Sequence, residues 1–287
     1  MQANGTVWAW GYNAYGQLGT GNTNQSSKPV VQSACILPPP APYPPPSAFT
    51  KNISANLKFA LAAKSDGTVE GWGYNQDGEL GNGTQINQYT PVQAVGLTGV
   101  TTVAAGGAHG LAVTTSGSVW TWGYNGYGEL GSGTTSNRSI PLAINSFTGV
   151  IAASGGYYHS IVLKGDGTVW GFGYNGYGQL GDGTTTERNS PVQTVGLTGM
   201  TAVSAGQYHS IALKNDGTVW AWGNNGYGQL GDGTTADKHS AVQVAGLTNV
   251  KAIAAGYDHN LALRSDGTVW AWGYGSNGML GDGATNS

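Results

Sequence analysis

The chain has 287 residues, of which only 9% are charged, and it carries a net charge of −3 with an isoelectric point near 5.9. This weak negative charge argues against a nucleic-acid partner or an anionic membrane surface, both of which are held by clustered lysine and arginine. No apolar run reaches about 18 residues, so we expect no membrane span, and the single cysteine, Cys35, excludes an internal disulfide.

One motif recurs from end to end of the chain. A glycine that closes an aromatic strand returns after 62 residues and then every 50 residues (Gly11, Gly73, Gly123, Gly173, Gly223 and Gly273). A period of this length is typical of solenoids, propellers and arrays. We therefore expect a single domain over residues 1–287. Residues 1–4 run directly into the first repeat, so we expect no secretion signal.

The spacing between the first two repeats is 62 residues instead of 50, and an insert accounts for the difference. Residues 33–50 form a proline-rich insert, and proline favours an extended polyproline conformation that cannot join a sheet. We expect this insert to bulge from the rim between the first two repeats. The next copy departs from the others, because residues 56–59 replace the recurring Gly-x-x-His pattern and Glu70 replaces the first tryptophan of the aromatic strand.

The cleanest copy covers residues 201–250. Four of its stretches have strand patterns, in which β-branched or aromatic residues alternate with smaller ones: 201–206, 209–214, 219–222 and 241–244. Asp216-Gly217, between the second and third, favours a tight hairpin turn. No stretch has helical periodicity. Several short strands per repeat, with glycine at every corner, predict an all-β propeller of about six blades.

The recurring strings "AAG..H..AL..DGTVW.WG" and "GYNGYGQLGDGT" resemble the regulator of chromosome condensation repeat family, and the chain is similar to its bacterial members. The resemblance covers nearly the whole chain except residues 33–50. It implies a β-propeller, usually of seven blades in this family. Members include a nuclear exchange factor for a small GTPase, plant photoreceptor-linked proteins, bacterial effectors and a β-lactamase inhibitor. The resemblance therefore specifies the fold far more than the function.

The number of repeats is not whole. Without the 12 extra residues of the first interval, 275 residues remain, which is 5.5 periods of 50. Three interpretations stay open: a ring left open at the terminal blade, a fragment of a longer chain, or a ring completed by another molecule. An unpaired blade edge would invite strand addition from a partner.

Two recurring residue types are expected to be structural. A histidine in every blade is better suited to a hydrogen bond that ties a loop than to one metal, because positions one blade apart do not converge within ~2 Å of an ion. We expect neither a metal nor a cofactor. The structural residues are Trp8, Trp10, Trp72, Trp120, Trp122, Trp170, Trp220, Trp222, Trp270, Trp272, His109, His159, His209 and His259.

Candidate binding residues come from three features. A tyrosine series after the Trp-Gly corner would present aromatic rings on one face. Loops before the last strand differ while the framework repeats, as recognition loops do. The third feature is the diverged copy of the repeat together with the proline-rich insert. These residues are Tyr127, Tyr177 and Tyr227, then Tyr89, Arg138, Arg188 and Lys238, then Tyr43 and Glu70.

The sequence contains no nucleophile elbow, HExxH, P-loop or CxxC motif, so we do not expect an enzyme. We expect a protein-binding scaffold. Its partner is unknown, and other copies of the chain are among the candidates. A lectin-like module that binds carbohydrate and an assembly subunit are the alternatives. Low charge and a single cysteine favour an extracellular or cell-surface location.

Overall fold

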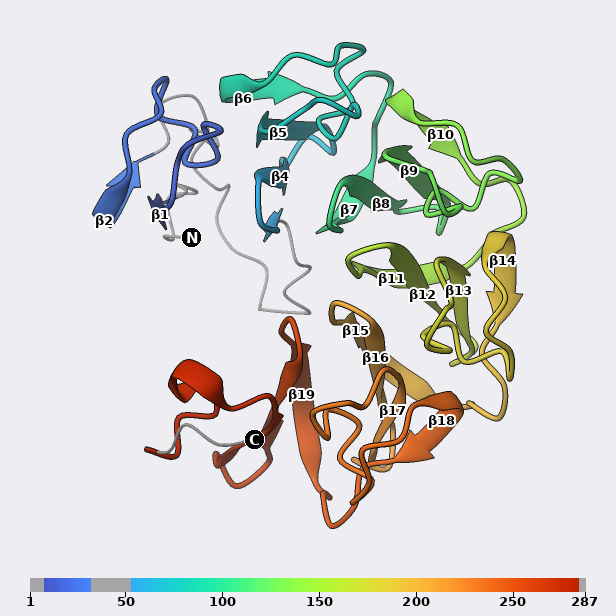
Figure 1. Cartoon of the computed structure of the whole chain (residues 1–287). Helices are drawn as coiled ribbons and strands as arrows, with labels where there is room; N and C mark the ends of the chain where they lie inside the picture. The colour runs from blue at the N-terminus through green and yellow to red at the C-terminus, as the bar shows by residue number, and fades with distance from the viewer. Residues whose placement is uncertain (1–7, 32–52, 284–287) are drawn as a thin grey trace, which may run out of the picture. The chain divides into compact units, whose positions relative to one another are not determined.

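The computed structural model of the chain describes residues 8–31 and 53–283 (Figure 1). These residues form 21 strands and one short 3-10 helix, Ser276–Gly278, so the all-β prediction is confirmed. The proline-rich insert, and Tyr43 within it, lie outside the described residues.

The described strands form six antiparallel sheets that share one order. Each complete sheet has four strands that pair in chain order, which is the meander of a propeller blade. The chain divides into two compact units. Unit 1 comprises Met1–Tyr124 with Asn137–Ala143, and unit 2 comprises Asn125–Ser136 with Ile144–Ser287.

Unit 1 contains a two-stranded sheet and two four-stranded sheets. The two-stranded sheet is β1 (Trp8–Gly11) with β2 (Ser26–Val31). The four-stranded sheets are β3 (Ile53–Ala55), β4 (Phe59–Ala63), β5 (Val69–Gly73) and β6 (Gln88–Gln93), and β7 (Val100–Ala105), β8 (His109–Thr114), β9 (Val119–Gly123) and β10 (Arg138–Ala143).

Unit 2 contains two four-stranded sheets and a three-stranded sheet. The first two are β11 (Val150–Gly155), β12 (His159–Lys164), β13 (Val169–Gly173) and β14 (Arg188–Gln193), and β15 (Met200–Ala205), β16 (His209–Lys214), β17 (Val219–Gly223) and β18 (Lys238–Gln243). The third is β19 (Val250–Ala255), β20 (His259–Arg264) and β21 (Val269–Gly273).

The predicted strands of the cleanest copy agree with the structure except at the fourth. The second strand begins and ends where predicted, at His209 and Lys214. The fourth, predicted over 241–244, begins three residues earlier at Lys238. Its pairing with β17 contains an irregularity, and polar residues on an exposed outer strand give a weak alternation signal. The residues predicted to lie in a loop there, including Arg188 and Lys238, are therefore strand residues.

The turn between the second and third strands is set by side-chain hydrogen bonds. Asp216 Oδ1 accepts hydrogen bonds from the backbone N–H of Thr218 at 3.0 Å and from its hydroxyl at 2.6 Å. Gly217 takes a φ of 81°, which a residue with a side chain adopts only with strain. The Asp-Gly-Thr sequence thus fixes the hairpin that places β16 beside β17.

Neighbouring sheets of a unit pack through the tryptophan of the third strand. In unit 2, Trp222 is fully buried among Ile161, Leu163 and Val169 of the preceding sheet. Its indole Nε1–H donates to the carbonyl of Gln179 in that sheet's loop at 2.8 Å. Ser210 donates to the same oxygen at 2.9 Å. Two side chains of one sheet therefore donate hydrogen bonds to the same carbonyl oxygen of the preceding sheet.

Replacement of Trp222 tests this packing. Trp222→Ala removes a buried aromatic side chain and is expected to lower the free energy of unfolding by about 3–5 kcal/mol. Trp222→Phe is expected to cost only about 1 kcal/mol, because Ser210 still satisfies the Gln179 carbonyl. Phe172 already fills the corresponding place in the preceding sheet. Urea unfolding measures both, with the half-buried Trp220→Ala as control. Equal losses for Trp222→Ala and Trp220→Ala would contradict the interpretation.

Candidate functional site

One end of each sheet in unit 2 brings two connections together. His159 at the start of β12 pairs with Gly173 at the end of β13, so the β11–β12 connection and the segment after β13 lie side by side. The Tyr174 N–H donates to the Tyr158 carbonyl at 2.8 Å. This end of the sheet therefore carries tyrosines from both connections.

The corresponding connections of the three sheets in unit 2 are joined by their backbones. The Tyr157 N–H donates to the Gln207 carbonyl at 3.2 Å, and the Gln207 N–H donates to the Tyr257 carbonyl at 2.8 Å. The Gln207 side-chain amide also hydrogen-bonds the Tyr257 hydroxyl. These bonds hold the three connections in a fixed arrangement.

The tyrosines of these connections form a continuous aromatic cluster. Tyr157 lies 4.5 Å from Tyr158 and 6.2 Å from Tyr257 between ring centroids. Tyr208 lies 5.2 Å from Tyr177, and the network extends to the other rings at similar distances. Edge-to-face contacts of this kind are favourable. The tyrosine cluster comprises Tyr127, Tyr157, Tyr158, Tyr174, Tyr177, Tyr208 and Tyr257.

Burial favours the neutral form of Tyr208 and Tyr257. Burial, followed by the neighbouring phenols, raises the pKa of Tyr208 above its usual value, and burial likewise raises the pKa of Tyr257. Burial also raises the pKa of the Asp258 carboxyl. The cluster is partly exposed, so it offers apolar ring area together with uncharged hydroxyl groups.

The sequence singled out part of this cluster. The structure places Tyr127 and Tyr177 within it, whereas Tyr227 contacts Tyr274 with a centroid distance of 4.6 Å. The tyrosines of the connection before the recurring histidine were missed. The signal was present in the sequence, because in three repeats a tyrosine stands one or two residues before that histidine. These tyrosines are Tyr157 and Tyr158, Tyr208, and Tyr257.

Two basic residues proposed for recognition form ion pairs within their own repeats. Arg188 lies 2.7 Å from the Asp182 carboxylate, and Lys238 lies 3.3 Å from that of Asp232. The Asp182 carboxylate also accepts a hydrogen bond from Asn175 at 3.1 Å. These aspartates therefore hold the base of the loop that follows the third strand.

The other proposed binding residues lie in unit 1. Arg138 is exposed at the start of β10. Tyr89, on β6, packs so closely against the backbone of Gly16 that a side chain at residue 16 would collide with its ring. Glu70 forms an ion pair with Lys64 at 3.1 Å. Their role in binding stays a prediction.

A buried asparagine organises the loop after the third strand in the two four-stranded sheets of unit 2. The Asn175 side-chain amide donates to the carbonyls of Thr184 and Thr186, and its oxygen accepts from the Leu180 N–H at 3.0 Å. Asn225 makes the same set of bonds in the next sheet. This asparagine, which recurs two residues after the anchor glycine, was not recognised from the sequence.

The recurring histidines link neighbouring sheets of unit 2. His159 Nε2 lies 2.9 Å from Ser210 Oγ, and His209 Nε2 lies 2.8 Å from Asn260 Oδ1. Because Asn260 Oδ1 is an acceptor, His209 carries its proton on Nε2. Its ring fills the space where a side chain at residue 206 would stand, so only glycine fits there. Burial lowers the pKa of His209 to about 4.

Two buried glutamates stand at equivalent positions of two successive repeats. Glu79 Oε2 accepts a hydrogen bond from the Asp77 N–H, and Glu129 Oε2 accepts one from the Tyr127 N–H, both at 2.9 Å. The second carboxyl oxygen of each has no hydrogen-bond partner among the described residues. Burial raises the pKa of both carboxyls to about 7. Glutamine stands at this position in other repeats, as at Gln179.

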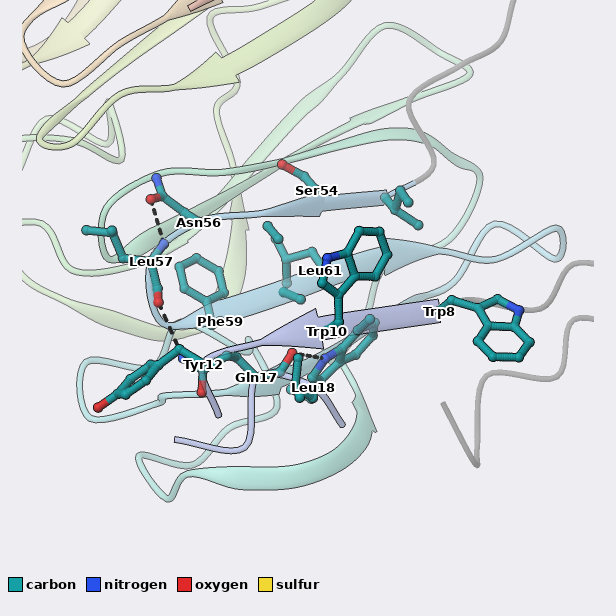
Figure 2. A pocket seen from close by; sticks show the side chains of 15 residues that line it. Trp8, Trp10, Tyr12, Gln17, Leu18, Ser54, Asn56, Leu57, Phe59 and Leu61 are labelled. Atoms are coloured by element: carbon teal, nitrogen blue, oxygen red, sulfur yellow. Dashed lines mark hydrogen bonds between the residues drawn. The ribbon is translucent and has the colours of Figure 1, made fainter. Parts of the chain in front are cut away.

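Unit 1 contains an apolar cleft of about 560 Å³ between β1 and the strands β3 and β4 (Figure 2). Trp8 and Trp10 line it from β1, and Ile53 and Leu61 line it from the other side. The Gln17 carbonyl at its edge accepts a hydrogen bond from Trp72 Nε1 at 2.7 Å. The cleft therefore adjoins the diverged copy of the repeat.

Over residues 8–31 and 53–283 the structure shows no group of three or more histidine, cysteine, aspartate or glutamate side chains able to hold a metal ion. Within the same ranges, no helix has the length and apolar character needed to cross a membrane.

The repeated four-stranded meander defines this protein as a β-propeller. The family model of the RCC1-like domain matches residues 1–287, and the chain belongs to that family. The resemblance to the regulator of chromosome condensation repeats is thereby confirmed. An RCC1-like propeller is in general a non-catalytic binding or exchange-factor fold, and it suits a protein-interaction scaffold.

Solved structures of the family share the fold. Human WBSCR16 superposes with a TM-score of 0.76 at 26% identity, covering 90% of this chain and 67% of that one. Yeast RCC1 (Prp20), solved bound to Kap60, gives a TM-score of 0.76 at 22% identity, covering 94% of this chain and 64% of that one. These matches confirm the propeller prediction.

Curated relatives match over shorter segments. The human E3 ubiquitin-protein ligase HERC2 is 35% identical over 113 residues, which are 38% of this chain and 2% of HERC2. The Arabidopsis thaliana ultraviolet-B receptor UVR8 is 33% identical over 89 residues, which are 31% of this chain and 18% of UVR8. The chain thus spans a small part of either relative.

Acid is expected to destabilise the fold through the buried histidines. The pKa of His209 is about 4 in the folded chain against an ordinary value of 6.5, so the unfolded state binds more protons between these values. The free energy of unfolding should fall by about 3 kcal/mol per such histidine as pH drops through this window. Urea unfolding at several pH values measures it. His209→Gln should lessen the slope, and an unchanged slope would contradict the assignment.

The buried glutamates have the opposite effect. The pKa of Glu129 is about 7 in the folded chain against an ordinary value of 4.5, so its contribution is fully present below pH 4.5 and is lost as pH rises through 7. Glu129→Gln should therefore increase stability at alkaline pH relative to the parent and have little effect in acid. Thermal unfolding at the two extremes measures the difference. A uniform shift at all pH values would contradict the prediction.

Proposed function

We propose that this chain is a non-enzymatic protein-binding scaffold whose recognition surface is the tyrosine cluster of unit 2. The observation that carries the proposal is the continuity of the cluster, in which rings from the connections of three sheets contact one another and stay partly exposed. Tyrosine is enriched at interfaces because its ring buries apolar area while its hydroxyl hydrogen-bonds.

The rigidity of the cluster supports the proposal. The backbone bonds from Tyr157 to Gln207 and from Gln207 to Tyr257 hold the three connections before any partner arrives. Little conformational entropy is then lost on binding, which improves affinity for a given contact area. A tyrosine ring also loses few rotatable bonds when it becomes buried.

The chemistry of the surface indicates the kind of partner patch it fits. Burial raises the pKa of the Tyr174 and Tyr208 phenols above the ordinary value near 10, so both rings are neutral at pH 7. The partner should therefore present apolar and uncharged hydrogen-bonding groups. Binding through the rings themselves should depend little on salt, because the phenols carry no charge.

Carbohydrate is the second candidate ligand. Aromatic rings beside a side-chain amide are suited to stacking on a sugar and hydrogen-bonding its hydroxyls, and Gln207 stands next to Tyr257 in this arrangement. This version of the proposal goes with a cell-surface location, for which the composition of the chain is the support.

Replacement of two cluster tyrosines tests the proposal. Tyr157→Ala with Tyr257→Ala removes two rings in contact and should weaken partner binding by about tenfold or more. Affinity capture from the source organism, followed by titration of the purified partner, measures the effect. The fold should persist, because both side chains are partly exposed.

Tyr227→Ala is the matched control, because Tyr227 is exposed and contacts Tyr274 instead of the cluster. Equal affinity for the parent and the double variant would refute the cluster as the recognition surface. A glycan array run with the same variants separates the alternatives, because glycan binding lost only in the double variant would assign the cluster to carbohydrate.

A further inference from the structure

We propose that Tyr227, Tyr274 and Asp258 of unit 2 form a binding site for an organic ammonium group, such as the one that ends a lysine side chain. The inference rests on a comparison between copies of the repeat, because the equivalent place in unit 1 holds such a group. The site is separate from the tyrosine cluster and does not depend on the function proposed for that cluster.

The first observation is a lysine that lies against two tyrosine rings in unit 1. Lys58 Nζ lies 4.8 Å from the centroid of the Tyr74 ring and 5.6 Å from the centroid of the Tyr15 ring. The two rings contact each other edge to face, with a centroid distance of 5.3 Å. The face of an aromatic ring attracts a cation that lies within about 6 Å of its centroid. This pair of rings therefore accommodates an ammonium group.

The second observation is that unit 2 contains the same pair of rings. Tyr227 and Tyr274 stand at the positions of Tyr15 and Tyr74 in the repeat, and their ring centroids lie 4.6 Å apart. The backbone N–H of Tyr227 donates to a glutamine side chain at 2.8 Å, as that of Tyr15 does at 3.0 Å. Tyr227 is 48% exposed, so a ligand can reach its ring.

The backbone at the third position of the site is also the same in both units. The Tyr74 N–H donates to the Lys58 carbonyl at 2.9 Å, and the Tyr274 N–H donates to the Asp258 carbonyl at 2.9 Å. The side chains of Lys58 and Asp258 therefore start from equivalent points beside equivalent rings. The difference between the two sites is the charge of this side chain.

The third observation is that the described residues provide no cation for Asp258. Over residues 8–31 and 53–283 its carboxylate has no hydrogen bond or ion pair, and no lysine or arginine lies over the Tyr227 or Tyr274 ring. Residues 284–287, which follow the described part, contain no basic side chain. Burial raises the pKa of the Asp258 carboxyl, as is expected for a carboxylate that lacks a counter-ion.

The intermediate copies in unit 2 fill the same place with a ring. Tyr158 and Tyr208 stand at the position of Lys58 in the repeat. Tyr158 lies 5.1 Å from Tyr127 between ring centroids, and Tyr208 lies 5.2 Å from Tyr177. An aromatic ring or an ammonium group can both contact the ring of the preceding sheet favourably. A carboxylate cannot, because the ring faces are themselves negative.

The composition of the site favours an organic cation over a metal ion. One carboxylate supplies too few ligands for calcium, which takes about six to eight oxygen atoms. An ammonium group can instead donate hydrogen bonds to the carboxylate while its methylene chain covers a ring. The ligand is therefore an organic ammonium compound, either a small amine or a lysine side chain of a polypeptide.

Titration with n-butylammonium tests the site, because this ion has the same methylene chain and head group as lysine. In nitrogen-15 NMR spectra the amide signals of Asp258 and Tyr274 should shift saturably. Uncharged 1-butanol is the matched control and should leave them unchanged. A blocked tripeptide with lysine between two glycines distinguishes the sources: tighter binding than n-butylammonium indicates a polypeptide ligand, and equal or weaker binding indicates a small amine.

Substitutions in unit 2 locate the site. Asp258→Lys recreates the arrangement of Lys58 and should abolish binding, because the chain then supplies its own ammonium group. Asp258→Asn removes the charge and should weaken binding by about threefold or more. Tyr227→Ala should also weaken it by about threefold. The same variant should keep the binding of a partner through the tyrosine cluster, so the two surfaces are told apart.

A substitution in unit 1 should create a second site. Lys58→Asp places a carboxylate beside Tyr15 and Tyr74, so each chain should then bind two n-butylammonium ions instead of one. Lys251→Asp is the matched control. It makes the same change of charge at an exposed position near the opposite end of its sheet, and it should add no site.

Three results would overturn the proposal. n-Butylammonium and 1-butanol bind equally, which would show apolar adsorption, or folded Asp258→Lys binds the ammonium ion as the parent does. The third is a folded Lys58→Asp variant that gains no site. If either lysine or aspartate variant unfolds, as judged by circular dichroism, Asp258→Asn decides the question, and unweakened binding to it would refute the role of the carboxylate.

Discussion

The structure depends on a single carbonyl in each repeat that is shared between two sheets. In unit 2 the Gln179 carbonyl accepts from Trp222 and Ser210, and the Gln229 carbonyl accepts from Trp272 at 3.0 Å and from an asparagine amide. Three of these four donors are fully buried, so an unmade bond would leave a polar group without water. This constraint fixes the loop after each third strand against the next sheet and so determines where the exposed connections lie.

A framework fixed in this way separates structural from variable positions. Tryptophan, asparagine and histidine recur because each satisfies buried groups, and they leave little freedom for specificity. The connection before each histidine needs only its backbone and the glycine beneath the imidazole ring, so its other side chains are free to differ. In unit 2 these positions hold Tyr157, Tyr158, Tyr208 and Tyr257, whereas unit 1 has Leu57 and Lys58 in the corresponding connection. The surface that we propose for recognition in unit 2 is accordingly aromatic.

The same constraint explains the cleft of unit 1. A third-strand tryptophan is buried only when its own sheet and the preceding one surround it, as Trp122 and Trp222 are. Among the described residues β1 has one neighbour, so Trp10 stays exposed and Ile53 opposite it has no cover.

The sequence by itself determined the period, the all-β class and the second strand of the repeat, because alternation and Asp-Gly turns are local signals. It also pointed to Tyr127 and Tyr177, though not to the tyrosines that complete their cluster. The start of the fourth strand was misjudged, because an outer strand that faces solvent has no apolar alternation. Only the tertiary structure decided which residues meet. The contacts of Tyr157 with Tyr257, the pairing of Arg188 with Asp182 and the cleft beside Trp10 depend on how strands from separate repeats pack, and no local pattern encodes those distances.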